Sequence, residues 1–196
     1  MGRIEENKLQ KKNSLMETAF QLYTSKGIAK TSISDIVEQA GIAKGTFYLY
    51  FRDKYDLQEQ LIVHKSEQLF RHALEHSGYE ALPTADDKIL AIIDDILFQL
   101  QKKPHLLRFI NKNLSWGIFR RALNRSDMDY ISVFRDILGT TPADNGMLEI
   151  QIYTILELVG STCHSVILDG DPVDLPHFLP HLHRSVRAIL ESGRTA

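Results

Sequence analysis

Apolar residues recur with the period of an α-helix along nearly the whole chain, and this pattern restricts the possible fold more than any other feature. Spacings of three and four residues join the apolar positions of almost every segment. No run alternates between apolar and polar residues for long enough to predict a strand. We therefore expect an all-α protein of about nine helices.

Glycine, proline and capping residues divide this pattern into separate helices. A first helix is predicted over about 9–26, before Gly27. A second is expected to begin after Ser32, with Asp35 three residues on as an approximate capping box, and to end at Gly41. Further helices are predicted over about 44–50, 53–76, 84–102, 104–123, 127–138, 144–168 and 177–192. Because an interior proline clashes with the preceding turn, the last helix should start late or bend at Pro180.

Charge divides the chain into two parts of opposite sign. Residues 1–54 contain nine Lys or Arg against six Asp or Glu, a net charge of +3, whereas the remainder has a net charge of −5. A basic N-terminal part joined to an acidic body predicts an anionic partner for the N-terminal part alone. We expect two domains, over residues 1–54 and 55–196.

The stretch GIAKGTFYLYF, residues 41–51, combines a small polar start with a cluster of aromatic residues. On a helix, Phe47 and Phe51 share one face and can bury against the first two helices, each contributing roughly 2 kcal/mol. The exposed N-terminal end of this helix should let the backbone approach a groove and its free N–H groups approach phosphate. This end comprises Ala43, Lys44, Gly45 and Thr46.

The residues that follow also suit a nucleic acid. Tyr48 and Tyr50 can lie along a sugar-phosphate backbone and donate a hydroxyl proton to it, and Lys54 adds a cation. Two short helices across a glycine turn form a helix-turn-helix, whose second helix enters the major groove of DNA. The alternative is an ordinary helical hairpin with all its rings in a core. Leu49, nearly opposite Phe47, and the small polar start favour the DNA-binding interpretation.

Residues 9–61 resemble the tetracycline-repressor (TetR) family of bacterial transcription regulators. The segments that carry the resemblance are KTSISDIVEQAG, AKGTFYLYF and RDKYDL. The resemblance implies that Ser32 and Tyr50 contact phosphate and that Lys54 clamps the DNA backbone. It further implies base-edge positions for Ser34, Lys44, Thr46 and Tyr48, although many members carry Arg or Thr in place of Ser34. The rest of the chain is similar to the family only in its length and helical character.

A single headpiece makes too few contacts to select one site in a genome, so a homodimer on a palindromic operator is expected. The last two predicted helices have apolar faces that could join two chains, or could only complete the core of one chain. The resemblance favours the first possibility, because family members usually dimerise through two C-terminal helices. The candidate interface residues are Leu156, Gly160, Phe178, Leu182, Val186 and Ile189.

The middle of the body mixes large apolar residues with a few polar ones, as in a closed pocket for a small molecule. The same composition suits a solid core. The candidate ligand-binding residues are Phe98, Phe109, Asn113, Trp116, Phe119, Tyr153 and Glu157. By the resemblance, a bound effector would tilt the fourth helix and weaken operator binding, as in a ligand-responsive repressor.

Other classes of protein find little support in the sequence. The single cysteine, Cys163, excludes an internal disulfide, and the charged N-terminus lacks a signal segment, so a cytoplasmic protein is expected. The apolar stretch 147–168 contains polar residues that are costly in hydrocarbon, so we expect a packed helix and no membrane partner. A helix-turn-helix protein that organises the chromosome or cell division at many sites remains an alternative.

Enzyme, cofactor and metal sites are not predicted. The sequence contains no glycine-rich phosphate loop and no Gly-x-Ser-x-Gly motif, so we expect neither an enzyme nor a cofactor. His177 and His181 are spaced to share a helix face, near Cys163, His164 and His183. Without a Cys-x-x-Cys or His-Glu-x-x-His motif, these histidines are interpreted as solvated or at a dimer rim, and no metal site is expected.

Overall fold

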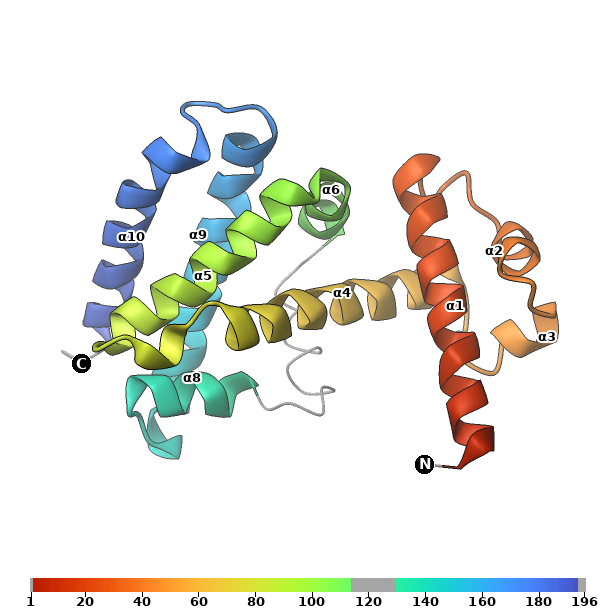
Figure 1. The fold of residues 1–196 in the computed structure, drawn as a ribbon, viewed down its shortest axis with the longest axis horizontal. Coiled ribbons are helices and arrows are strands. Elements are labelled where there is room, and N and C mark those ends of the chain that lie inside the picture. The colour runs from red at the N-terminus through yellow and green to blue at the C-terminus, as the bar shows by residue number, and fades with distance from the viewer. Residues whose placement is uncertain (1, 114–129, 194–196) are drawn as a thin grey trace. The chain divides into compact units, whose positions relative to one another are not determined.

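The computed structural model describes residues 2–113 and 130–193, and all the regular structure in this part of the chain is helical (Figure 1). It contains nine α-helices and two short 3-10 helices, which confirms the predicted all-α class. The chain divides into two compact units, Met1–His64 and Lys65–Ala196, which we call the head and the body. The division lies beyond the domain boundary predicted after residue 54, because the first turns of a long helix contribute to the core of the head.

Local sequence explains the helices of the head. Their bounds are α1 Arg3–Ser25, α2 Ile33–Ala40, α3 Lys44–Phe47 and α4 Lys54–His76, of which α4 continues into the body. The Ser32 side chain accepts a hydrogen bond from the Asp35 N–H, and the Asp35 carboxylate accepts one from the Ser32 N–H, so the predicted capping box is confirmed. The Asp53 carboxylate caps α4 by accepting hydrogen bonds from the N–H groups of Tyr55 and Asp56.

The core of the head is formed where α1, α2 and α3 meet the first turns of α4. Its fully buried side chains are Leu15, Ala19, Ile36, Phe47, Phe51, Leu57, Leu61 and Ile62. Phe47 and Phe51 therefore anchor the segment after α2, as their shared face predicts. Because α4 supplies three of these residues, the head needs this helix to complete its core.

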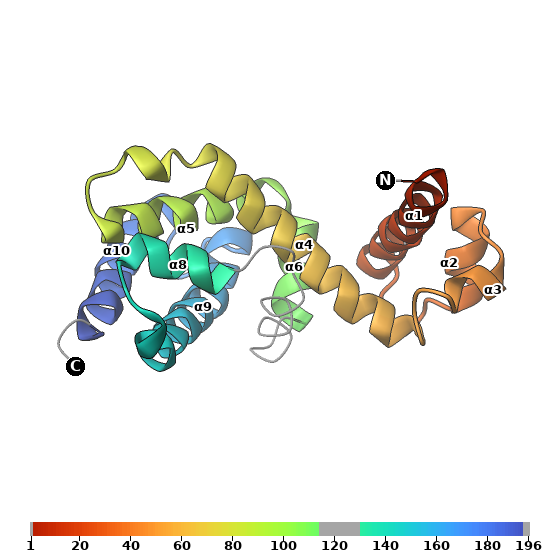
Figure 2. The same ribbon diagram turned by 90° about the horizontal axis from the view of Figure 1, so that it is seen from below.

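In the residues that the structure describes, the body consists of the rest of α4, five further α-helices and the two 3-10 helices. The bounds of these five α-helices are α5 Ala85–Lys102, α6 Pro104–Asn113, α8 Tyr130–Leu138, α9 Asn145–Leu168 and α10 Leu175–Ser192. Helices α9 and α10 lie side by side in both views of the fold (Figures 1 and 2). Their buried residues join those of α5 in one core, which includes Leu97, Cys163, Leu182 and Val186.

Helices α1, α3 and α10 differ in their bounds from the prediction. Helix α1 begins at Arg3, well before the predicted start at about residue 9. Helix α3 ends at Phe47 and continues only as turns, with Tyr50 and Phe51 donating to the Phe47 carbonyl at 3.0 Å. Helix α10 begins at Leu175, capped by Asp174, and continues through Pro180, so it does not start late. Pro180 lies in the second turn of α10, where it removes only one helical hydrogen bond, and the packing of the helix compensates for this loss. The part of the predicted helix 104–123 beyond residue 113 lies outside the described residues.

Residues Gly146–Leu168 of α9 are long and apolar enough to cross a membrane by length and composition. The core helix of a water-soluble protein has the same character. In the body, α9 packs against α5, α6 and α10. One side of α9 thus contributes to the core, although only 22% of its most apolar window is buried inside the chain.

Candidate DNA-binding surface and ligand cavity

A left-handed turn at Gly41 joins α2 to α3. Gly41 has φ 66°, which residues with a side chain rarely adopt, and its N–H donates to the Glu38 carbonyl at 3.1 Å. The next N–H, of Ile42, donates to the Val37 carbonyl at 2.9 Å. These bonds close the end of α2 and redirect the chain within three residues.

Aromatic packing fixes the orientation of the segment that begins at α3. The rings of Phe47 and Phe51 lie 5.5 Å apart, and both are buried. The ring of Tyr48 meets that of Phe47 edge to face at 5.4 Å, while Tyr48 remains 53% exposed. Buried rings thus hold one side of the segment and leave the other side free for a partner.

Most of the predicted DNA contacts lie on the surface of the head. Ser32, Ser34, Ala43, Lys44, Gly45 and Tyr48 are exposed, and Thr46, Tyr50 and Lys54 are partly buried. The Lys44 ammonium lies 3.4 Å from the Ser34 hydroxyl, which brings α2 and α3 together at one polar edge. The surface therefore offers a cation, hydroxyl groups and small residues together, as a helix-turn-helix requires.

Two predicted contacts also have structural tasks. Ser32 caps α2, and hydrogen bonds from the Ser32 N–H and from Lys26 hold the pKa of the Asp35 carboxyl below its usual value. Lys54 donates to the carbonyl oxygens of Ile28 at 2.9 Å and Thr31 at 3.0 Å, in the loop between α1 and α2. In this structure its ammonium therefore stabilises that loop.

Tyr23 of α1 also contacts the start of α4, a role that the sequence did not indicate. Its hydroxyl donates to the Lys54 carbonyl at 2.9 Å. Burial raises the pKa of the Tyr23 hydroxyl above its usual value. Lys54 and Tyr23 together tie α1, the following loop and the start of α4 into one unit.

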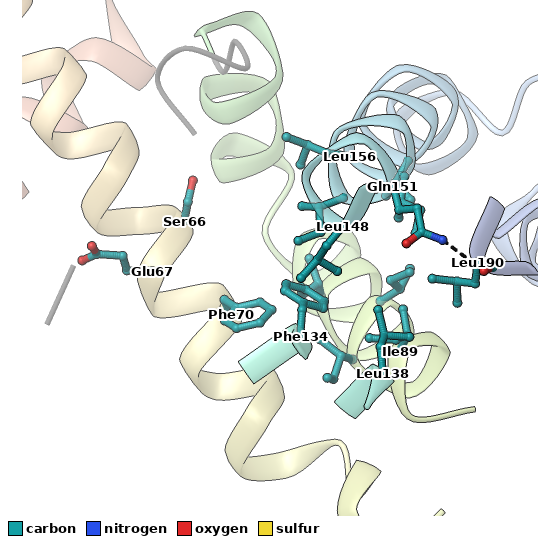
Figure 3. A pocket seen from close by; sticks show the side chains of 16 residues that line it. Ser66, Glu67, Phe70, Ile89, Phe134, Leu138, Leu148, Gln151, Leu156 and Leu190 are labelled. Carbon is teal, nitrogen blue, oxygen red and sulfur yellow. Dashed lines mark hydrogen bonds between the residues drawn. The ribbon is translucent and has the colours of Figure 1, made fainter. Parts of the chain in front are cut away.

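The body contains an apolar, partly open cavity of about 150 Å³, lined by residues of α4, α5, α8, α9 and α10 (Figure 3). An engineered apolar cavity of similar volume holds a benzene molecule. Phe70 extends from α4 toward Phe134 of α8, and their ring centroids are 5.4 Å apart. The lining residues are Ser66, Glu67, Phe70, Ile89, Ile92, Ile93, Ile96, Phe134, Leu138, Leu148, Gln151, Ile152, Ile155, Leu156, Val159 and Leu190.

Two polar side chains of the lining restrict what the cavity can bind. The Gln151 amide nitrogen donates to the carbonyl oxygens of Ile189 and Leu190, both at 3.0 Å, which leaves the amide oxygen as an acceptor (Figure 3). The buried Ser66 hydroxyl has no hydrogen-bond partner among the described residues. A ligand that is mainly apolar and carries few polar groups matches this lining.

None of the predicted ligand-binding residues within the described part of the chain lines this cavity. Phe98, Tyr153 and Glu157 are exposed, and Phe109 is buried in α6. Asn113 ends α6, and Trp116 and Phe119 lie outside the described residues. The aliphatic lining of α5 and α9 escaped prediction, because isoleucine and leucine at helical spacing are equally typical of a solid core.

The predicted dimer-interface residues differ in how far the body itself buries them. Leu182 and Val186 are buried in the core of the body itself, so they are not available to a second chain. Leu156 lines the cavity, Phe178 and Ile189 are partly buried, and only Gly160 is exposed. Periodicity identifies the apolar face of α10, but it does not show whether that face meets the core of its own chain or a second chain.

Among the described residues, no group of three or more His, Cys, Asp or Glu side chains could hold a metal ion. His177 pairs with Asp174 and His183 with Asp94, and the His181 ring lies 2.8 Å from the Arg184 guanidinium. Burial raises the pKa of the Cys163 thiol to about 11, which keeps it protonated at neutral pH. These side chains therefore serve local packing and pairing.

Comparison with known proteins agrees with the geometry of the head. Residues 15–61 match the family described as bacterial regulatory proteins, tetR family. Over 63 residues the chain is 43% identical to the uncharacterised HTH-type transcriptional regulator YvdT of Bacillus subtilis, covering 30% of this chain and 32% of that protein. This match is thus limited to about a third of the relative.

Similarity over most of the chain is found with a second protein of Bacillus subtilis, the fatty acid metabolism regulator protein. The two are 26% identical over 187 residues, which cover 91% of this chain and 93% of the relative. The solved structure of the regulator FadR from Bacillus subtilis in complex with stearoyl-CoA has the same fold, with a TM-score of 0.55, 21% identity and coverage of 92% and 97% of the two chains. The helix-turn-helix of the head, the family matched over residues 15–61 and the shared fold lead to one conclusion: the head is similar to the DNA-binding part of TetR-family regulators, and the chain as a whole shares the fold of solved TetR-like regulators.

Proposed function

We propose that the protein is a cytoplasmic repressor that binds a palindromic DNA operator as a homodimer and releases it when an apolar effector occupies the cavity of the body. The observation that carries the DNA-binding part is the polar edge of the head. Lys44, Ser34 and Tyr48 are exposed together on a segment that Phe47 and Phe51 hold in place. Cations and hydroxyls held on a rigid element are what phosphate and base edges require.

The exposed face of α9 supports a dimer. Ile150 and Tyr153 are 59% and 42% exposed and share a face with Gly160, which lets a second helix approach closely. Only 22% of the most apolar window of α9 is buried inside the chain. A second copy packed against this face would remove that surface from water.

The cavity and the similar proteins support an effector with an apolar chain. One similar protein is named a fatty acid metabolism regulator, and a solved structure of the same fold contains stearoyl-CoA. The cavity wall here is almost entirely aliphatic and aromatic. We therefore propose a fatty acyl group as the first effector to test.

Helix α4 can connect effector and operator. It carries Ser66, Glu67 and Phe70 in the cavity wall, and its first residue, Lys54, holds the loop before α2. A ligand that displaces Phe70 would move α4 and, with it, the support of the head. A coupling free energy of about 1–3 kcal/mol would change operator occupancy substantially.

The DNA-binding proposal is tested by selecting bacterial genomic fragments with the purified protein at physiological salt. We expect an inverted repeat at one or a few loci, lost with Tyr48→Ala while the melting temperature stays unchanged, because Tyr48 is exposed. Dozens of bound loci would instead indicate an organiser of the chromosome. Binding without sequence preference would contradict the proposal.

The dimer and the effector are tested separately. Ile150→Asp should lower the dimer fraction in sedimentation, whereas Val173→Asp, at another exposed apolar residue, should not. Stearoyl-CoA should release the selected operator in a fluorescence anisotropy titration, and coenzyme A without an acyl chain should not. An unchanged dimer with Ile150→Asp, or release by coenzyme A alone, would contradict the respective part of the proposal.

A further inference from the structure

Leu49 is the most exposed of the large apolar side chains in the described part of the chain, with 79% of its surface accessible. A single exposed leucine is ordinary on a protein surface. This one, however, lies in the segment that a helix-turn-helix presents to DNA. No role in phosphate binding suits it, since its side chain has neither a charge nor a hydrogen-bond donor.

The neighbours of Leu49 hold it facing outward. Phe47 and Phe51, two residues before and two after it, are both buried in the core of the head. The Leu49 N–H donates to the Thr46 carbonyl at 3.2 Å, and the Tyr50 N–H donates to the Phe47 carbonyl at 3.0 Å, so the backbone on both sides is hydrogen-bonded. Leu49 therefore has little freedom to fold back onto the protein.

Polar groups that suit the DNA backbone lie on either side of Leu49. Tyr48 is exposed beside it, and Tyr50 is partly buried with its ring 6.3 Å from that of Phe51. If these hydroxyls contact phosphate or sugar, the leucine between them faces the floor of the groove. The apolar group that base edges present in the major groove is the C5-methyl of thymine.

We propose that Leu49 is a specificity-determining residue that recognises the methyl group of a thymine in each operator half-site. The proposal rests on the proposed DNA-binding function of the head. Burying one methyl group against the leucine should strengthen binding roughly three- to fourfold in each half-site. Leu49 would thereby favour A·T over G·C at one position without a hydrogen bond.

The test removes the thymine methyl group and the Leu49 side chain separately and then together. Each thymine of the selected operator is replaced by deoxyuracil, which lacks only the methyl group, and the affinity of the full chain is measured. We expect one position per half-site at which uracil weakens the wild type and no longer matters in Leu49→Ala. Leu9→Ala, a 47% exposed leucine of α1, serves as control and should respond to uracil as the wild type does.

The other outcomes separate the possible failures. If Leu49→Ala lowers affinity equally on thymine and uracil operators, the side chain acts as a wedge or spacer, and methyl recognition is refuted. If Leu49→Ala and the wild type respond alike to every uracil, the residue reads no methyl group. If the wild type selects no sequence at all, the DNA-binding proposal itself fails, and this inference fails with it.

Discussion

The ammonium of Lys54 donates hydrogen bonds to the carbonyl oxygens of Ile28 and Thr31, so removing this side chain should lower the stability of the fold. We expect Lys54→Ala to lower the free energy of unfolding by about 1–3 kcal/mol, since two partly buried carbonyl groups lose a charged donor. Thermal unfolding followed by circular dichroism measures this change. The resemblance alone predicts a different result, a variant of unchanged stability that binds DNA weakly.

Lys44→Ala is the matched control on the same surface. Lys44 is exposed, and within the described residues its ammonium makes one long hydrogen bond, to the Ser34 hydroxyl at 3.4 Å, so its removal should leave the melting temperature unchanged. It should reduce the slope of log affinity against log salt by about one unit, as expected for one phosphate contact. Equal melting temperatures for the two alanine variants would contradict the structural role of Lys54.

At the scale of elements, two carboxylates of α5, Asp87 and Asp94, pair with side chains of α10, and their pKa values are shifted in opposite directions. Arg187 donates to the Asp87 carboxylate at 2.6 Å, and hydrogen bonds from Thr84 and Arg187 lower the pKa of Asp87. A lowered pKa means that the ionised form stabilises the fold above the unfolded-state value of about 3.9. Asp87→Asn should therefore reduce stability at neutral pH, and the difference from wild type should narrow as the pH falls below about 4.

The ionised carboxylate of Asp94 should have the opposite effect on stability from that of Asp87. Burial raises its pKa although the His183 ring pairs with it at 2.8 Å. A carboxyl group whose pKa is raised by folding favours the folded state while it is protonated. This contribution is fully present below the unfolded-state pKa and is lost as the pH rises through the folded-state pKa. Asp94→Asn removes the buried charge and keeps an oxygen for His183, so we expect equal or greater stability at neutral pH. Denaturant unfolding at several pH values tests both variants, and a marked loss with Asp94→Asn at pH 7 would refute this prediction.

At the scale of the whole molecule, effector response should depend on the free volume of the body. Ile155→Phe adds bulk to the cavity lining and should reduce release by stearoyl-CoA at least tenfold while operator affinity is kept. Val173→Phe adds the same ring at an exposed site and should leave the response intact. Anisotropy titrations of the operator complex compare the two. A normal response in Ile155→Phe would place the effector elsewhere.

Much of the head could be predicted from sequence because its determinants are local. The capping box of Ser32, the stop at Gly41 and the shared face of Phe47 and Phe51 each involve residues a few positions apart. Spacing of three and four residues also identified the helices of the body within the described residues, including α9. The start of α1, the end of α3 and the start of α10 differ from the prediction, because periodicity alone does not determine where a helix begins or ends.

The sequence by itself thus determined the helical class, the order of the helices and the outward polar edge of the head, because periodicity and capping act over one or two turns. The tertiary structure alone decided that Lys54 supports a loop, that Leu182 and Val186 are buried in their own chain, and that α4, α5, α8, α9 and α10 line a common cavity. Each of these depends on residues far apart in the chain. An apolar face looks the same in sequence whether it meets a core, a ligand or a second subunit, and only packing distinguishes them.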